Sequence, residues 1–220
     1  MWMTDARGKS GGHVITKNRQ GQAVRTKVTP VNRRSNTQQN SRSRFTSLSQ
    51  NWRALTQAQR DSWNSAASDT KRSNIFGDAY SPTGKNFYMI VNENLLITGG
   101  AVVTSPPAID TPVSLLTFTI GSNTTAAQTL AYTATPSGAD TSLLIEATRP
   151  LSPGVGSGGS AFRRLAVIAG ATASPANTFA AYSALFGTPV AGQKIFFRVT
   201  PISEISGTRG TPLQTSGITT

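Results

Sequence analysis

The residues that could do chemistry in this chain are few and lie far apart. The sequence has one histidine, His13, no cysteine, and nine acidic residues that do not cluster. A Ser-His-Asp arrangement would have to use that single histidine, and no spacing of His, Asp and Glu matches a metal site. Without cysteine there is no thiolate nucleophile, thiolate ligand or disulfide. We therefore expect no enzyme activity and no cofactor, with a hydrolase built on two distant carboxylates as the open alternative.

Two glycine-containing segments resemble phosphate-binding loops but lack the required surroundings. Gly8-Lys9-Ser10 matches the end of a P-loop, yet that motif needs a glycine five residues before its Gly-Lys pair, where Met3 stands. Residues 154–160, with the sequence GVGSGGS, are not followed by the helix and the acidic residue of a dinucleotide-binding fingerprint. We interpret this second segment as a mobile loop between strands.

The formal net charge of +12 falls almost entirely on the N-terminal third of the chain. Residues 1–72 contain 14 Lys/Arg and 3 Asp/Glu, whereas residues 73–220 contain 7 Lys/Arg and 6 Asp/Glu. This step predicts two parts with different partners, and the basic part favours an anionic surface. The N-terminus has no apolar signal segment, and no apolar run is long enough to cross a bilayer. We therefore expect synthesis in the cytoplasm without a signal peptide, and no membrane partner.

Residues 1–44 are predicted to form an extended basic arm that becomes ordered on a partner. The segment is rich in Gly, Asn, Gln and Arg and has too few apolar residues for a core of its own. Residues 13–16 and 23–29 alternate apolar and polar side chains, which favours a small hairpin around Gly21-Gln22. The cations are candidate contacts, either with another subunit or with nucleic-acid phosphates bound without sequence readout: Arg7, Lys9, Lys17, Arg19, Arg25, Lys27, Arg33, Arg34, Arg42 and Arg44.

Residues 45–100 are predicted to form a small three-helix segment. An apolar stripe with spacings of 3, 4 and 3 residues begins at Phe45 and indicates a helix from about Asn36 to Ala54. The two tryptophans of this segment are expected to pack between the helices rather than stack on a ligand. The predicted helical core consists of Phe45, Leu48, Trp52, Leu55, Trp63 and Phe87.

Capping residues set the predicted ends of these helices. Thr56 and Gln59 form a capping box at the start of the second helix. Ser81-Pro82 is expected to begin the third helix, with the serine as N-cap and the proline at the first helical position. Gly99-Gly100 supplies the left-handed residue that ends it.

Residues 101–112 are expected to be a Pro-rich linker, and residues 113–220 an antiparallel β-sandwich. The hydrophobic period changes to two after the linker, with Ile195, Phe197 and Val199 facing inward on the strongest strand. The predicted strands cover residues 116–120, 130–134, 141–148, 163–169, 194–202 and 211–217. The expected fold class is therefore α+β: an extended basic N-terminal arm, a small three-helix segment and a C-terminal antiparallel β-sandwich.

The sandwich segment resembles a fibronectin type III-like domain. The resemblance lies in KIFFRVTPISEISGTRGTPLQTSG, where an aromatic-x-Arg-Val strand leads through a glycine-bearing turn to a Ser/Thr-rich final strand. It covers about residues 113–217 and implies an immunoglobulin-like topology.

Over nearly its whole length the chain also resembles uncharacterised proteins of tailed bacteriophages and prophages. The shared residues are Arg7-Gly8-Lys9-x-Gly11-Gly12-His13, Lys17-Asn18-Arg19, Arg25-x-Lys27-Val28-Thr29-Pro30, Trp52-Arg53-x-Leu55-Thr56-x-Ala58-Gln59-Arg60-x-x-Trp63 and Phe76-Gly77. The resemblance implies a virion component.

These observations lead us to expect a structural virion protein, either a capsid decoration or a minor capsid or tail protein. The basic arm and helices would anchor it to the capsid or tail lattice, and the sandwich would be displayed as a decoration or spacer. Its partners would be other virion proteins, with homo-oligomers in the assembly. The alternative is a nucleic-acid-binding protein packaged with, or acting on, the genome. Carbohydrate binding by the sandwich loops is a third hypothesis, although the loops show no aromatic platform.

Overall fold

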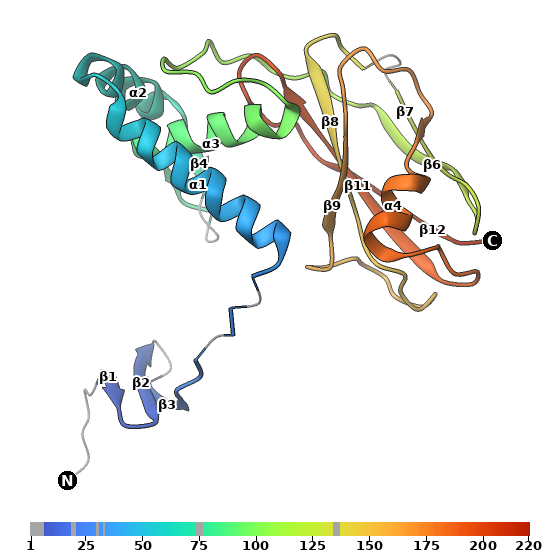
Figure 1. Cartoon of the computed structure of the whole chain (residues 1–220), viewed down its shortest axis with the longest axis horizontal. Helices are drawn as coiled ribbons and strands as arrows, with labels where there is room; N and C mark the ends of the chain where they lie inside the picture. The colour runs from blue at the N-terminus through green and yellow to red at the C-terminus, as the bar shows by residue number, and fades with distance from the viewer. Residues whose placement is uncertain (1–6, 19–20, 30, 33, 74–76, 134–136) are drawn as a thin grey trace. The chain divides into compact units, whose positions relative to one another are not determined.

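Helices and antiparallel sheets occur together in the chain, which confirms the predicted α+β class (Figure 1). The computed structural model describes all residues except 1–6, 19–20, 30, 33, 74–76 and 134–136. Arg19 and Arg33, two of the predicted partner-contact residues, lie outside the described residues, as does the side chain of Lys17. The chain divides into two units, residues 1–42 and residues 43–220.

The first unit contains a small three-stranded antiparallel sheet. Its strands, in the order β1-β2-β3, are β1 (Gly8–Ser10), β2 (His13–Asn18) and β3 (Gly21–Thr26). The expected hairpin is confirmed, but Gly21 and Gln22 belong to β3 rather than to the turn, because they pair with Asn18 and Lys17. The prediction of an extended arm was wrong for β1, which folds back on β2 through a turn where Gly11 has a φ of 55°. Glycine adopts that left-handed conformation without the penalty that a Cβ would bring.

Three helices begin the rest of the chain: α1 (Asn36–Ala54), α2 (Gln57–Asp69) and α3 (Gly84–Thr98). The bounds of α1 are those predicted from the apolar stripe. The capping box is also confirmed, since the Thr56 hydroxyl accepts from the Gln59 amide while the Gln59 side chain accepts from the Thr56 amide. Between α2 and α3, the two-residue strands β4 (Arg72–Ser73) and β5 (Ala79–Tyr80) pair with each other.

The N-cap predicted for α3 was wrong by two residues. Thr83, not Ser81, caps the helix through a hydroxyl that accepts from the Asn86 amide, and the helix begins at Gly84. A Cβ at Gly84 would lie 2.9 Å from the Asn64 Cα, so the two helices approach too closely there for any other residue. The C-terminal stop is as predicted, with Gly99 in the left-handed region.

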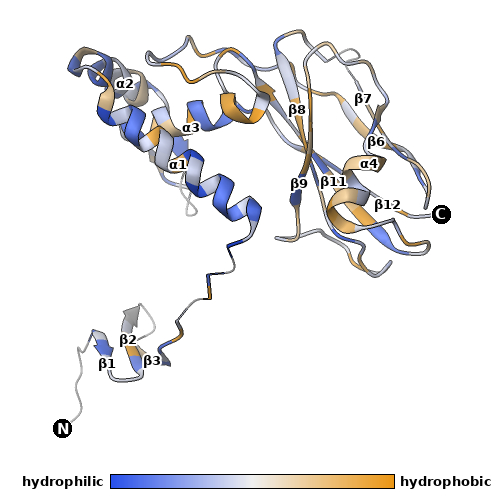
Figure 2. Cartoon of the chain, in the orientation of Figure 1, coloured by the Kyte–Doolittle hydropathy of each residue, from blue (hydrophilic) through white to orange (hydrophobic). Residues whose placement is uncertain are grey.

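The helices share one hydrophobic core. Trp63 is completely buried, and its ring centroid lies 5.7 Å from that of Phe87 and 5.2 Å from that of Tyr88. Phe45 was predicted in this core but is 63% exposed, because the buried part of α1 begins only at Leu48. Figure 2 shows the first half of α1 coloured as largely hydrophilic. The remaining predicted core residues are buried, or half-buried in the case of Trp52.

Residues 113–220 form two antiparallel sheets that contribute to a second core. The first sheet has the order β10-β7-β6 and the second the order β12-β11-β8-β9. The strands are β6 (Thr117–Asn123), β7 (Gln128–Thr133), β8 (Thr141–Ala147), β9 (Arg163–Ile168), β10 (Ala176–Asn177), β11 (Lys194–Ser203) and β12 (Leu213–Ile218). Ile195, Phe197 and Val199 are completely buried, as predicted. The helix α4 (Phe179–Phe186) was not predicted.

The Pro-rich segment between the two cores is held at several points. The Trp63 indole donates to the Thr104 carbonyl at 2.8 Å, and the buried Asn92 side chain accepts from the Val103 amide at 2.7 Å. Farther along, the Asp110 carboxylate accepts hydrogen bonds from Ser203 and Ser206. These hydrogen bonds fix the segment at both ends. The segment is therefore not the free linker that its composition predicted.

Candidate functional site

The sheet of the first unit separates its side chains by face. Directly opposed residues of an antiparallel ladder share a face, and successive residues alternate between faces. Lys9 pairs with Val14 and Val14 pairs with Arg25, so the two cations stand in one row across all three strands. Arg7 is exposed and comes just before β1; because Gly8 has a φ of 120°, strand alternation does not extend to Arg7, which only flanks this row.

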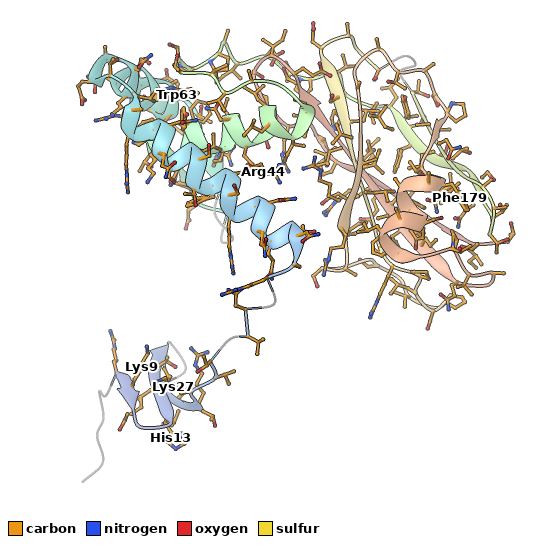
Figure 3. All side chains as sticks on the ribbon, viewed as in Figure 1. Lys9, His13, Lys27, Arg44, Trp63 and Phe179 are labelled. Carbon is orange, nitrogen blue, oxygen red and sulfur yellow. The ribbon has the colours of Figure 1, made fainter. Side chains whose placement is uncertain are left out.

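Lys27 extends the same row of cations past the end of β3. Its amide donates to the Gly12 carbonyl at 2.7 Å, so the ladder continues one residue beyond Thr26. Lys27 follows Arg25 by two residues and therefore shares its face. We call the surface formed by Lys9, Arg25 and Lys27 the cationic face; Figure 3 labels two of its members.

The other face of the sheet has no cation among its described side chains. His13 lies opposite Thr26, and Ile15 lies opposite Val24. Val24 is 63% exposed, and no described side chain of the sheet is fully buried. The sheet thus presents a basic face and a mildly apolar face, both open to a partner.

Carboxylates that would neutralise the cationic face are almost absent from this unit. Residues 1–42 contain nine Lys/Arg and one acidic residue, Asp5. Like charges so close together raise the local positive potential, which attracts polyanions. The cationic face is therefore suited to phosphates or to an acidic protein surface.

The three remaining described cations of the predicted set differ in their surroundings. Arg34 and Arg42 are exposed, and the Arg42 guanidinium donates to the Asn32 side chain at 3.0 Å. Arg44 is half-buried, with its guanidinium 3.4 Å from the Glu93 carboxylate on α3. Arg44 is consequently less available to a partner than the cations of the sheet (Figure 3).

A second charged cluster joins α3 to the β-sheets. Buried Asn94 donates to the Gly207 carbonyl at 2.7 Å and accepts from the Arg209 guanidinium at 2.9 Å. Burial lowers the pKa of Arg209, while the nearby Glu146 and Glu93 carboxylates oppose that shift. We call the Asn94, Gly207 and Arg209 contacts the α3 latch; its role is to fix the helical core against the sheets.

Groups for metal binding do not gather in the described part of the chain. No set of three or more His, Asp or Glu side chains is placed there to hold a metal ion. Of the helices that the structure describes, none combines the length and apolar composition needed to cross a membrane.

Comparison with known proteins identifies no relative. No protein-family model matches the sequence, and neither the curated proteins nor the solved structures gave a match. The functional argument therefore depends on the surfaces of this chain alone.

Two features of these surfaces went unrecognised in the sequence. The cationic face was visible in part, because Arg25 and Lys27 follow a spacing of two residues. The α3 latch had no local signal, since its partners are separated by 113 and 115 positions in the chain.

Proposed function

We propose that this chain is a structural protein of a tailed-bacteriophage particle, anchored to a capsid or tail lattice through its N-terminal unit. The observation that supports this most is the sheet of residues 8–26, in which no described side chain is fully buried and Lys9 and Arg25 share one face. Three strands need a hydrophobic face or a packing partner to be stable independently. A particle lattice would supply that partner.

The finer fold assignment belongs to the same proposal. We infer that residues 113–220 are a β-sandwich of the fibronectin III or immunoglobulin-like type. Its support is that strands of the β10-β7-β6 and β12-β11-β8-β9 sheets contribute to one core. Such a domain, with six Lys/Arg and three Asp/Glu, is less basic than the N-terminal unit and suits display on a particle surface as a decoration or spacer.

The proposed anchoring surface includes both faces of the N-terminal sheet. The cationic face would meet acidic patches of neighbouring virion subunits, and the face with Ile15 and Val24 would bury its apolar side chains there. Ordering of such a segment in an interface costs conformational entropy, which the interface contacts must exceed. Copies of this chain repeated in the lattice would form a homo-oligomer.

The deciding experiment is mass spectrometry of particles purified on a density gradient, combined with limited proteolysis of the free protein. We expect the chain to co-purify with particles and the free protein to be cleaved first within residues 7–35. Particles should protect those sites. Absence of the chain from particles, or resistance of the N-terminal unit in the free monomer, would overturn the proposal.

A second candidate function is non-specific binding to nucleic acid, which the placement of Lys9, Arg25 and Lys27 on one face favours. Each neutralised phosphate contributes about 0.9 to the slope of log K against log salt concentration for duplex DNA. Replacing Lys9 and Arg25 together by glutamine should therefore reduce the magnitude of this slope by the contribution of about two phosphate contacts. Lys85→Gln, an exposed cation on α3, is the matched control. Binding that is insensitive to salt would exclude this function.

A further inference from the structure

A pocket of about 300 Å³ lies at the edge of the β-sheets, within residues 43–220. It is lined by Arg149, Ser160, Ala161, Arg163 and Phe186. Arg149 follows β8, Arg163 begins β9, and Phe186 ends α4. The glycine-rich segment 154–159 leads directly into Ser160, so the loop with no assigned role in the sequence borders this pocket.

One of the two arginines is held in place by backbone carbonyls. A terminal nitrogen of Arg163 donates to the Phe162 carbonyl at 2.8 Å and to the Ser160 carbonyl at 3.2 Å. Because a guanidinium has five N–H donors in a planar fork, the other donors stay available to a ligand. The Arg163 guanidinium is thus oriented before any ligand arrives.

The other polar groups of the pocket are uncommitted. Within the described part of the chain, neither the Arg149 guanidinium nor the Ser160 hydroxyl makes a hydrogen bond or an ion pair. The Glu146 carboxylate on β8, three residues before Arg149, is bound to Arg198, with 2.7 Å between its Oε2 and the Arg198 Nη2. Two cations therefore line the pocket, and no carboxylate does.

An aromatic ring gives the pocket an apolar wall. Phe186 is half-buried and packs on Tyr182, with 5.0 Å between the ring centroids. Tyr182 is completely buried and donates its hydroxyl to the Thr148 carbonyl at 3.1 Å, which fixes the support beneath Phe186. Ala161 adds a second small apolar surface.

We propose that this pocket binds an anionic sugar unit, a monosaccharide ring that bears a carboxylate or a phosphate. Arg149 and Arg163 would bind the anionic oxygens by charge-assisted hydrogen bonds. Ser160 would bind a ring hydroxyl, and Phe186 would pack against the C–H face of the ring. The volume of the pocket is at the lower end of the range for ligand pockets, which favours one sugar ring over an oligosaccharide or a dinucleotide. This activity goes beyond a structural role and does not depend on it.

The test is titration of the full chain with glucuronic acid and with glucose 6-phosphate, followed by NMR shifts of backbone amides. We expect millimolar or tighter binding of at least one of them, with the largest shifts at residues 160–163 and 186. Glucose and inorganic phosphate are the controls, each of which lacks one half of the ligand. Preference for the carboxylate or the phosphate sugar tells which anion the site is built for.

Substitutions separate this site from general charge attraction. Arg149→Gln and Arg163→Gln should each weaken binding by about tenfold or more, the size of one charge-assisted hydrogen bond. Arg164→Gln is the matched control, because the next residue of β9 points to the opposite side and donates to the Ile97 carbonyl. Binding unchanged by the first two variants, equal binding of glucose or of inorganic phosphate, or no binding of either sugar would overturn the proposal. The shift map of the unmodified chain gives the answer even if a variant fails to fold.

Discussion

The two units of the chain both contain antiparallel sheets, but among the side chains that the structure describes only the sheets of residues 43–220 include completely buried ones. In the four-stranded sheet, Phe197 and Ala147 face each other across β11 and β8, and both are completely buried. In the three-stranded sheet, Ile15 and Val24 face each other across β2 and β3, and Val24 is 63% exposed. The same ladder of backbone hydrogen bonds is thus present in both, with very different amounts of hydrophobic burial.

This difference indicates that residues 43–220 provide the stability of the fold and that residues 1–42 provide a surface for a partner. Net stabilisation by a backbone hydrogen bond is small, so a sheet depends chiefly on the apolar surface it removes from water. Residues 43–220 have two cores of this kind, whereas residues 1–42 have an exposed sheet and most of the unbalanced charge. The N-terminal unit is suited to gain its missing burial from a partner.

Truncating a core side chain should produce the largest effect and tests the comparison directly. We expect Trp63→Ala to lower the free energy of unfolding by about 3–5 kcal/mol, because the ring is completely buried between Phe87 and Tyr88. Chemical denaturation followed by circular dichroism measures this. Val24→Ala in the N-terminal sheet should change the same quantity by less than about 0.5 kcal/mol. Equal costs for the two would contradict the division into a core unit and a coreless unit.

Breaking the α3 latch should have the next largest effect. Asn94→Ala leaves the buried Gly207 carbonyl and the Arg209 guanidinium without this partner, at an expected cost of about 2 kcal/mol. The same denaturation experiment measures the loss. The control is Asn86→Ala on the exposed side of α3, which should be neutral because its side chain makes no hydrogen bond in the described structure. A neutral Asn94→Ala would show that the helices and sheets do not depend on this contact.

The capping box at the start of α2 tests how much a single helix end contributes to the stability of residues 43–220. Thr56→Ala should destabilise residues 43–220 by about 1 kcal/mol, since the Gln59 amide loses its hydroxyl acceptor. Thr56→Ser keeps the hydroxyl and should stay close to the unmodified protein. The midpoint of thermal unfolding distinguishes the two, and equal midpoints would mean that the cap contributes nothing.

The free energy of unfolding should decrease in alkaline solution, through tyrosine ionisation that does not occur at neutral pH. Burial raises the pKa of Tyr88, Tyr132 and Tyr182 above the ordinary value of 10.0, so the folded state favours the protonated phenols. Their contribution is fully present below pH 10 and is lost as pH rises, because the unfolded chain releases its protons first. Unfolding free energy measured against pH should therefore fall above about pH 10.

Tyr182→Phe tests whether Tyr182 causes this loss of stability at high pH. The unfolding free energy of the variant should decrease less steeply with pH, because the completely buried phenol that would ionise on unfolding has been removed. All four tyrosines lie in residues 43–220, so the effect reports on that unit alone. A profile that is flat in both proteins would contradict the role given to burial.

Local patterns predicted most of the elements in this chain. The 3-4-3 stripe gave the bounds of α1, the Thr56 capping box gave the start of α2, and the period of two gave the strand with Ile195, Phe197 and Val199. These signals are local, since each depends on neighbours within one or two turns or on alternation along one strand. The cationic residues of the candidate site were found by the same means, through composition and charge.

Errors occurred wherever a distant segment decided the outcome. Phe45 continues the stripe of α1 but stays exposed, because no described segment covers that part of the helix. Ser81-Pro82 has the residue types of a helix start, but α3 begins two residues later than predicted, at Gly84. At Gly84 the helix lies too close to Asn64 of α2 for a residue with a Cβ. The helix α4 has an almost wholly apolar sequence, FAAYSALF, which lacks the periodic contrast that identifies a surface helix.

The sequence by itself determined that this protein is α+β, that its positive charge is concentrated at the N-terminal end, which residues bound its first helix and which residue begins its second. These properties follow from composition and from interactions within a few residues. Only the tertiary structure decided that Lys9, Arg25 and Lys27 share a face, that Asn94 joins α3 to a loop more than a hundred residues away, and that Arg149, Arg163 and Phe186 line one pocket. Each of these depends on strand register or on packing between distant segments, which local periodicity does not encode.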